Sequence, residues 1–255
     1  MPPLITEIEI RSAVTAQAPG SRGIPGDYTI NPYRGCAFGC SYCYASKFVY
    51  EDAAKRVGWG DWVEVKRNVV SALEQDAPKL FGKSVWLGSA TDPYQPVELR
   101  LGLTRALLEV LLMAYPTHLH LQTRSPHVLR DIPLLQRFGD TLTVGISIPT
   151  DSDVVRKVFE PRAPSIARRL QTARALKEAG VPVAISVAPL LPYTPERLAK
   201  MIQPACDRVW VGGIQLYDRS DPVGQIYEDH GWSAYLRREH IAQTKAAMEA
   251  MGVGF

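Results

Sequence analysis

Asn31-Pro-Tyr-Arg-Gly-Cys-Ala-Phe-Gly-Cys-Ser-Tyr-Cys-Tyr44 is the stretch that decides how this 255-residue chain folds and what it binds. It holds three of the four cysteines, Cys36, Cys40 and Cys43, spaced as Cys-x3-Cys-x2-Cys. Glycines precede the first two cysteines, and glycine permits the positive φ angles and close backbone approach that wrapping around a metal centre requires. In a cubane iron–sulfur cluster held by three cysteines, one iron has no protein ligand, so another molecule must bind there.

A structural zinc site, a disulfide and inert core cysteines are the alternatives for this spacing. Structural zinc takes four closed ligands, usually as two paired half-sites. The remaining cysteine, Cys206, stands alone far along the chain, and no histidine lies near the motif. No secretory signal precedes the motif, which disfavours a disulfide. The spacing therefore favours a cluster over zinc. A chance grouping of inert core cysteines is the least favoured alternative.

Composition bounds the class of protein. With 46% hydrophobic residues, the chain has enough apolar side chains for a sizeable core, and single α/β barrels commonly reach this length. A net charge of +3 neither requires nor excludes a nucleic-acid partner. No apolar run reaches the roughly 18 residues that a membrane span needs. The low cysteine count fits a reducing compartment, so we expect a cytoplasmic protein.

Short apolar runs alternate with helical patterns about six times along the chain, which predicts βα units, parallel strands and right-handed crossovers. Six units, rather than eight, favour an open or partial barrel. We divide the chain into an irregular N-terminal extension, residues 1–26, with a short strand at 8–10, and a barrel domain, residues 27–255, with a C-terminal helical cap. The expected strands are 27–30, 84–88, 118–122, 141–148, 181–188 and 208–214, and the expected helices include 98–115, 126–138, 165–179, 195–205 and 233–251.

Polar residues follow nearly every expected strand, and in α/β barrels the chemistry lies at the C-terminal ends of the strands. Their recurrence at one end of the barrel predicts a functional site there. The segments are the cysteine loop, Ser89–Glu98, Thr123–Ser125, Ser147 with Pro149–Asp151, Pro192-Tyr193, and Gln215 with Tyr217.

The cysteine motif, with an aromatic residue before its last cysteine, resembles the signature of the radical S-adenosylmethionine (SAM) superfamily. Thr91-Asp-Pro-Tyr-Gln-Pro-Val-Glu98, Arg130-Asp131 and Glu160-Pro-Arg-Ala-Pro164 extend the resemblance to its spore photoproduct lyase-like branch, over roughly residues 28–215. The resemblance implies a partial (β/α)6 TIM-like barrel and a [4Fe–4S] cluster whose open iron is chelated by SAM. One electron from the cluster then cleaves SAM to methionine and a 5′-deoxyadenosyl radical, which abstracts hydrogen from the substrate.

The same resemblance implies residue roles around that cofactor. Tyr42 and Tyr44 match positions beside the cluster and the adenine, and Thr91 matches a hydroxyl that contacts SAM. Arg124 occupies the place of a basic residue that meets the SAM carboxylate, a pairing that suits a guanidinium. Ser147 matches a hydroxyl that bonds the ribose or the carboxylate.

The segment after the second strand departs from the family pattern. Spore photoproduct lyases carry a cysteine there that returns hydrogen to the substrate radical, whereas Ser89 takes that place here, and a serine O–H bond is too strong to donate hydrogen easily. We count Ser89 among the cofactor-binding positions and name Asp92 and Tyr94 as candidate catalytic residues. The structural alternatives are a helix cap for Ser89 and Thr91, and a turn started by Asp92 before its proline.

Other candidates have competing structural explanations. Arg169 belongs to a basic run that we expect on a solvated helix face. His118 and His120 alternate in a strand and share one face, where structural roles are favoured over a metal pair because no third ligand presents itself. Trp59 and Trp62 either stack on a base or pack half-buried, and packing is the default.

These observations lead to a cytoplasmic, lyase-like radical SAM enzyme. Its substrate is either a pyrimidine lesion in nucleic acid or a small nucleoside, sugar or secondary metabolite. We expect a monomer that receives electrons from a one-electron donor such as flavodoxin or ferredoxin and does not enter a membrane. The non-enzyme alternative is an iron–sulfur or zinc protein that binds without turnover.

Overall fold

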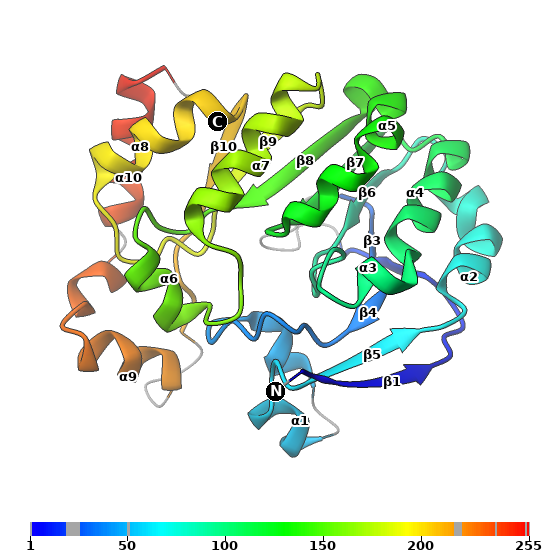
Figure 1. The fold of residues 1–255 in the computed structure, drawn as a ribbon, viewed down its shortest axis with the longest axis horizontal. Helices are drawn as coiled ribbons and strands as arrows, with labels where there is room; N and C mark the ends of the chain where they lie inside the picture. The colour runs from blue at the N-terminus through cyan, green and yellow to red at the C-terminus, as the bar shows by residue number, and fades with distance from the viewer. Residues whose placement is uncertain are drawn as a thin grey trace.

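A computed structural model describes residues 2–18, 26–49, 52–216, 221–237, 239–252 and 254 (Figure 1). Its strands form two sheets, one of seven strands and one of three. The strands are β1 (Leu4–Ile8), β2 (Val14–Ala16), β3 (Tyr28–Ile30), β4 (Tyr33–Arg34), β5 (Trp62–Lys66), β6 (Ser84–Leu87), β7 (His118–Thr123), β8 (Leu142–Ser147), β9 (Val183–Val187) and β10 (Arg208–Val211).

The seven-stranded sheet has the order β10-β9-β8-β7-β6-β3-β2. Every neighbouring pair from β3 to β10 is parallel, and only β2 runs antiparallel, against β3. Six parallel strands in this order confirm the predicted partial (β/α)6 barrel. Their C-terminal ends therefore lie along one edge, which is where the polar segments were expected to meet.

The α-helices are α1 (Ala53–Val57), α2 (Val69–Asp76), α3 (Glu98–Leu101), α4 (Leu103–Ala114), α5 (Ile132–Leu135), α6 (Asp153–Phe159), α7 (Ile166–Glu178), α8 (Pro195–Ile202), α9 (Pro222–Asp229) and α10 (Glu239–Ala250). Helices α2, α4, α5 and α7 lie along one face of the large sheet (Figure 1). Among the described residues, none of these helices is both long enough and apolar enough to cross a bilayer.

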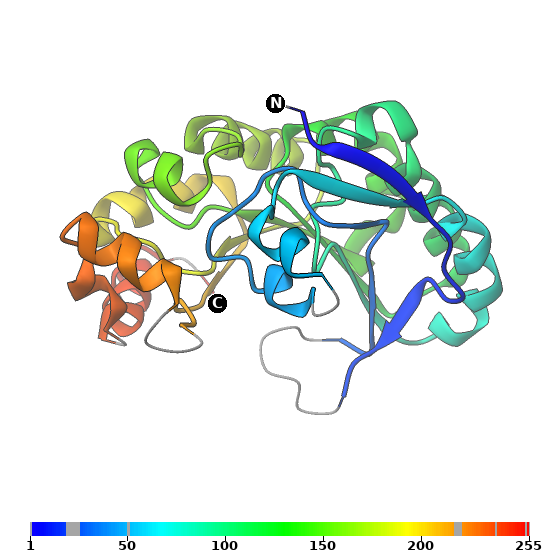
Figure 2. The ribbon, with the colours of Figure 1, turned by 90° about the horizontal axis from the view of Figure 1, so that it is seen from below.

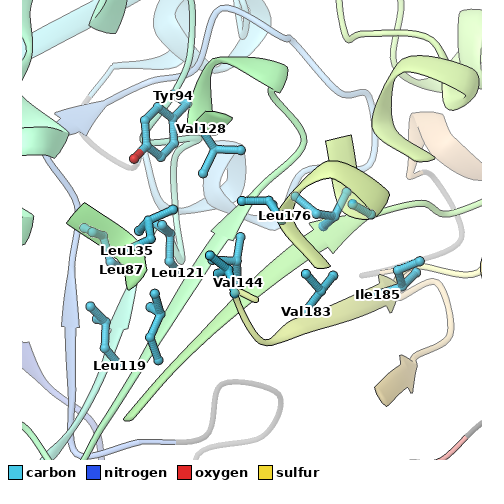
Figure 3. Packing of buried hydrophobic residues seen from close by; sticks show 14 of the residues in the cluster. Leu87, Tyr94, Leu119, Leu121, Val128, Leu135, Val144, Leu176, Val183 and Ile185 are labelled. Atoms are coloured by element: carbon cyan, nitrogen blue, oxygen red, sulfur yellow. The ribbon is translucent and has the colours of Figure 1, made fainter. Parts of the chain in front are cut away.

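The hydrophobic core lies between that face of the sheet and its helices. Leu119, Leu121, Val144 and Ile185 alternate along neighbouring strands and are completely buried. Figure 3 shows them packed in one layer with Leu176 of α7 and other helix residues. Burying such side chains contributes about 1.5–3 kcal/mol each, so this layer fixes the strands whose ends carry the candidate site.

The N-terminal segment differs from its predicted form. The strand expected at 8–10 lies instead at Leu4–Ile8 and pairs in parallel with β5, and Val14–Ala16 forms a strand inside the stretch expected to be a loop. Both strands are short and find their partners elsewhere in the chain, which local pattern does not reveal. In Figure 2 the small sheet of β1, β5 and β4 lies beside the large one.

The opposite face of the large sheet is polar and aromatic. Trp86 and His120 are register partners with ring centroids 3.9 Å apart. The Nε2 of His120 lies 2.8 Å from Gln122 Oε1, and Gln122 Nε2 donates to Ser147 Oγ at 2.8 Å. A Cβ on Gly145 would lie 2.3 Å from that Gln122 oxygen, so a larger residue there would displace the Gln122 and His120 side chains. His120 thus has a structural partner.

The burial of His120 has a testable effect on the stability of the protein at low pH. It lowers the pKa of His120 from 6.5 to about 4. Between these values the unfolded chain binds a proton that the folded chain does not, so stability falls as the pH falls. We expect the difference in unfolding free energy between wild type and His120→Gln to change by about 1.4 kcal/mol per pH unit between pH 6 and pH 5, measured by urea unfolding. The exposed His230→Gln serves as control, and an unchanged difference for His120→Gln would contradict the argument.

Candidate metal centre

The three cysteines of the motif lie in the loop between β4 and the 3-10 helix Tyr44–Phe48. Cys36 and Cys40 are buried, Cys43 is half-buried, and none forms a disulfide. Two backbone bonds close the loop into successive turns, from Gly39 N to Cys36 O and from Cys43 N to Cys40 O, both at 3.1 Å. The motif therefore folds back on itself in two successive turns.

Both glycines of the motif are required by close backbone contacts. Gly35 has φ +79°, and a Cβ there would lie 2.7 Å from the ring and the carbonyl oxygen of Trp62. Gly39 has φ +58°, and its Cβ would lie 3.2 Å from the Cα of Gly60. The loop is thus pressed against β5 and the turn before it, and side chains would hold it away.

Burial changes the pKa values of these thiols. It raises the pKa of Cys36 and of Cys40 to about 12 and that of Cys43 to about 11. Charge on Cys40 raises the pKa of Cys43 further, because the two thiols are neighbours. At neutral pH they keep their protons until a metal displaces them. Three thiols with raised pKa values fit a metal centre better than they fit a reactive nucleophile.

The donor set also fits a cluster better than a single ion. Within the described ranges, no three His, Cys, Asp or Glu side chains gather tightly enough to hold one ion. In a cubane cluster each thiolate binds a different iron, so the thiolates stand farther apart than the ligands of one zinc. Structural zinc takes four ligands, so the count of three cysteines is what favours a cluster over zinc.

The indole N–H of Trp59 is a further sign that a hydrogen-bond acceptor belongs beside this loop. Trp59 packs on the group formed by Cys36, Phe38, Cys40 and Ala163. Its indole Nε1 is buried and has no hydrogen-bond partner among the described residues. An unmet buried N–H costs about 1–3 kcal/mol, and a cluster sulfur beside this loop would accept it. The residues present therefore fit an iron–sulfur cluster.

Arg124, directly after β7, connects the cysteine loop to the strand ends. Its Nη1 donates to Cys40 Sγ at 2.8 Å, to the Tyr42 hydroxyl at 3.2 Å and to Glu160 Oε1. Its backbone N–H donates to Asp92 Oδ2 at 2.8 Å. The structure thus brings two of the predicted cofactor residues together: Arg124 is in direct contact with Tyr42 and with Cys40 of the motif.

Glu160 was named in the sequence only as part of a family motif, and its contact with the cysteine loop was not predicted. It follows α6, is completely buried, and accepts from Tyr42, Arg124 and Arg169. Burial alone would raise the pKa of Glu160, but Arg169 and Arg124 outweigh it and hold that pKa below its usual value. The acid stands between an apolar run and Pro161, which hinted at an inward position.

Arg169 corrects an expectation. It was assigned to a solvated helix face, yet it is completely buried. Its Nη1 donates to the carbonyl of Ser147 at 3.0 Å and its Nε to the carbonyl of Pro164 at 2.9 Å. It therefore ties the end of β8 to Glu160, and through Glu160 to the cysteine loop.

The segment after β6 packs against the same loop. Thr91 Oγ1 donates to the carbonyl of Gly35 at 2.7 Å. Asn31 holds the segment through its amide, donating to Ser89 Oγ at 3.0 Å, and Tyr44 donates to the Ser89 carbonyl at 2.6 Å. Ser89, Thr91 and Tyr44 are thus gathered beside the motif.

Asp92 and Tyr94 make contacts that hold the scaffold. Asp92 is buried and accepts from Thr123 Oγ1 at 2.7 Å and from the backbone N–H groups of Tyr94 and Arg124. Burial raises the pKa of Asp92. Tyr94 is completely buried in the core (Figure 3), and its hydroxyl donates to Asp131 at 2.9 Å. The structure therefore gives Tyr94 a packing contact and a hydrogen bond to Asp131, and its catalytic role stays a prediction.

The remaining predicted positions are Ser147, Trp59, Trp62 and Tyr217. Ser147 lies at the end of β8, and its side chain is buried and bonded to Gln122. Trp59 and Trp62 pack edge to face with centroids 5.7 Å apart, which confirms the packing interpretation. Tyr217 lies outside the described residues.

Comparisons with known proteins identify the family of this chain. A family model described as "Radical SAM superfamily" matches residues 30–205. An uncharacterized protein of Methanocaldococcus jannaschii is 34% identical over 172 residues, which cover 66% of this chain and 62% of the relative. An uncharacterized protein of Mycobacterium tuberculosis is 32% identical over 191 residues, which cover 73% of this chain and 56% of the relative. The matches thus span less than two thirds of these relatives.

Solved structures of spore photoproduct lyase share the fold. A mutant of that enzyme with bound AdoMet and dinucleoside spore photoproduct superposes with a TM-score of 0.61 and 20% identity, over 88% of this chain and 65% of the other. A second mutant superposes with a TM-score of 0.64 and 17% identity, over 96% and 78%. At these identities the likeness concerns the fold.

Proposed function

Because this chain belongs to the radical SAM superfamily, we propose that it is an enzyme that binds a [4Fe–4S] cluster on Cys36, Cys40 and Cys43 and cleaves SAM there. The observation that carries the proposal is a set of three thiols, two buried and one half-buried, beside a half-buried guanidinium and an unmet indole N–H. When bound, the cluster supplies the electron that cleaves SAM to methionine and a 5′-deoxyadenosyl radical, which takes hydrogen from the substrate.

Arg124 is the residue we assign to the SAM carboxylate. Its Nη1 is engaged, but its Nε and Nη2 donate to no described residue. Two parallel N–H donors on one edge of a guanidinium match the two oxygens of a carboxylate. Its side chain is 17% exposed, so the pairing takes place with little competing water.

The other cofactor positions surround the same loop. Ser147 Oγ accepts from Gln122, which leaves its own hydrogen to donate to the ribose or the carboxylate. Tyr42 and Tyr44 lie beside the cluster and the adenine, and Ser89 and Thr91 line the SAM site while they hold the motif. Asp92 orients Arg124 through its backbone N–H.

Two classes of substrate are proposed, each supported by a different observation. A pyrimidine lesion in nucleic acid is supported by the shared fold with spore photoproduct lyase. A small nucleoside, sugar or secondary metabolite is supported by Ser89, which stands where those lyases carry a hydrogen-returning cysteine, and by the modest net charge of +3. DNA binding that weakens steeply with salt would favour the first, and its absence the second.

We place this reaction in a reducing cytoplasm, in a monomer that receives its electron from a protein such as flavodoxin or ferredoxin. The direct test is anaerobic reconstitution of the chain with iron and sulfide, followed by addition of SAM and dithionite. We expect thiolate-to-iron charge-transfer absorption and reductant-dependent release of 5′-deoxyadenosine, measured by chromatography. Iron-loaded protein that never cleaves SAM would overturn the proposal.

A further inference from the structure

A cationic donor contacts one of the cysteine sulfurs directly. Arg124 Nη1 lies 2.8 Å from Cys40 Sγ. The proposed carboxylate contact uses the other edge of the same guanidinium, so it leaves this contact unexplained. A charge-assisted hydrogen bond is roughly twice as strong as a neutral one, and N–H donors to cluster sulfurs are among the factors that set reduction potential.

The guanidinium is held in place from several sides. Glu160 accepts from the same Nη1, and Asp92 accepts from the backbone N–H of Arg124. Glu160 is itself fixed by Arg169 and by the Tyr42 hydroxyl, all inside the protein. Arg124 therefore reaches the sulfur in one defined geometry rather than as a mobile surface charge.

We propose that Arg124 sets the reduction potential of the bound cluster through its contact with Cys40, and that Glu160 is the positioning residue that aims it. The inference rests on the proposed function only in requiring that a cluster binds. It assigns Arg124 a second role, exerted before SAM arrives and independent of the substrate.

The sign of the effect follows from charge. Arg124, Glu160 and Arg169 all act on Cys40, and two guanidinium cations with one carboxylate leave a net positive charge beside its sulfur. Reduction adds one electron to the cluster, so a positive charge in a low-dielectric site stabilises the reduced form more than the oxidised form. The contact therefore raises the reduction potential.

The test measures the midpoint potential of the reconstituted cluster, without SAM, by spectroscopically monitored titration. We expect Arg124→Gln to lower the ratio of reduced to oxidised cluster at a fixed potential about tenfold, which corresponds to about 59 mV for one electron. Arg124→Lys keeps the charge and should shift the potential less. Arg130→Gln is the matched control, because Arg130 bridges the buried Glu98 and Asp131 and contacts no cysteine.

Glu160→Gln separates positioning from simple electrostatics. Removal of a negative charge would by itself raise the potential, whereas loss of the correctly aimed Arg124 lowers it. We expect a lower potential. A higher potential in Glu160→Gln, or potentials in both Arg124 variants equal to that of wild type, would overturn the inference. Wild-type protein that takes up no cluster would instead overturn the proposed function, so the two failures are distinguishable.

Discussion

Replacing Cys36, Cys40 or Cys43 singly by alanine is expected to reduce 5′-deoxyadenosine release to the level of the iron-free protein. Each thiolate would hold a different iron, so the loss of any one removes a ligand that the cluster needs. Two remaining thiolates leave a second iron without a ligand, and the cluster is lost or mispositioned against Arg124. The effect should be nearly complete because SAM cleavage depends on the cluster.

Cys206→Ala is the matched control. Cys206 is also a buried free cysteine, but it lies just before β10, and its thiol donates to the Ile202 carbonyl at 3.5 Å. We expect this variant to keep both its iron and its SAM cleavage. The measurements are iron content, charge-transfer absorption and 5′-deoxyadenosine yield. Full iron content and activity in Cys36→Ala would contradict the assignment of the motif.

The barrel could be predicted because each of its strands and helices leaves a pattern within its own stretch of sequence. The six parallel strands of the large sheet are short apolar or alternating runs, and the helices between them show apolar residues at helical spacing, so the alternation of βα units is visible without tertiary information. The strands Leu4–Ile8 and Val14–Ala16 could not be placed in this way. They are defined by pairing with β5 and β3, and pairing partners distant in sequence leave no local pattern.

The site was predictable to the extent that it is built on strand ends. Arg124 and Ser147 follow parallel strands, and the topology alone brings them to one edge. Glu160 and Arg169 come from the region of α6 and α7, and their contact depends on how these helices pack. A basic run on a helix usually faces solvent, which is why the burial of Arg169 was missed. The hydrogen bond from Tyr94 to Asp131 could not be predicted either, because the two residues are distant in sequence and meet only through packing.

The buried ion cluster around Glu160 should also dominate the stability of this end of the barrel. Glu160 and Arg169 have completely buried side chains and bond each other, and Arg124 adds a second guanidinium. Glu160→Gln keeps the shape of the side chain but leaves two buried cations without a counter-charge. Breaking a buried ion pair on one side typically costs about 3–5 kcal/mol, and we expect a loss of that size in urea unfolding of the metal-free protein.

Glu109→Gln provides the same substitution in an exposed ion pair. Glu109 bonds Arg105 one helical turn away at 3.4 Å, with side chains 55% and 46% exposed, and such pairs contribute about 0.3–0.5 kcal/mol. The contrast between the two variants isolates burial as the cause. If Glu160→Gln cost no more than Glu109→Gln, the two arginines would have to reach water without a counter-ion. Arg124 would then not be held rigidly against Cys40, and its predicted influence on the cluster would lose its structural basis.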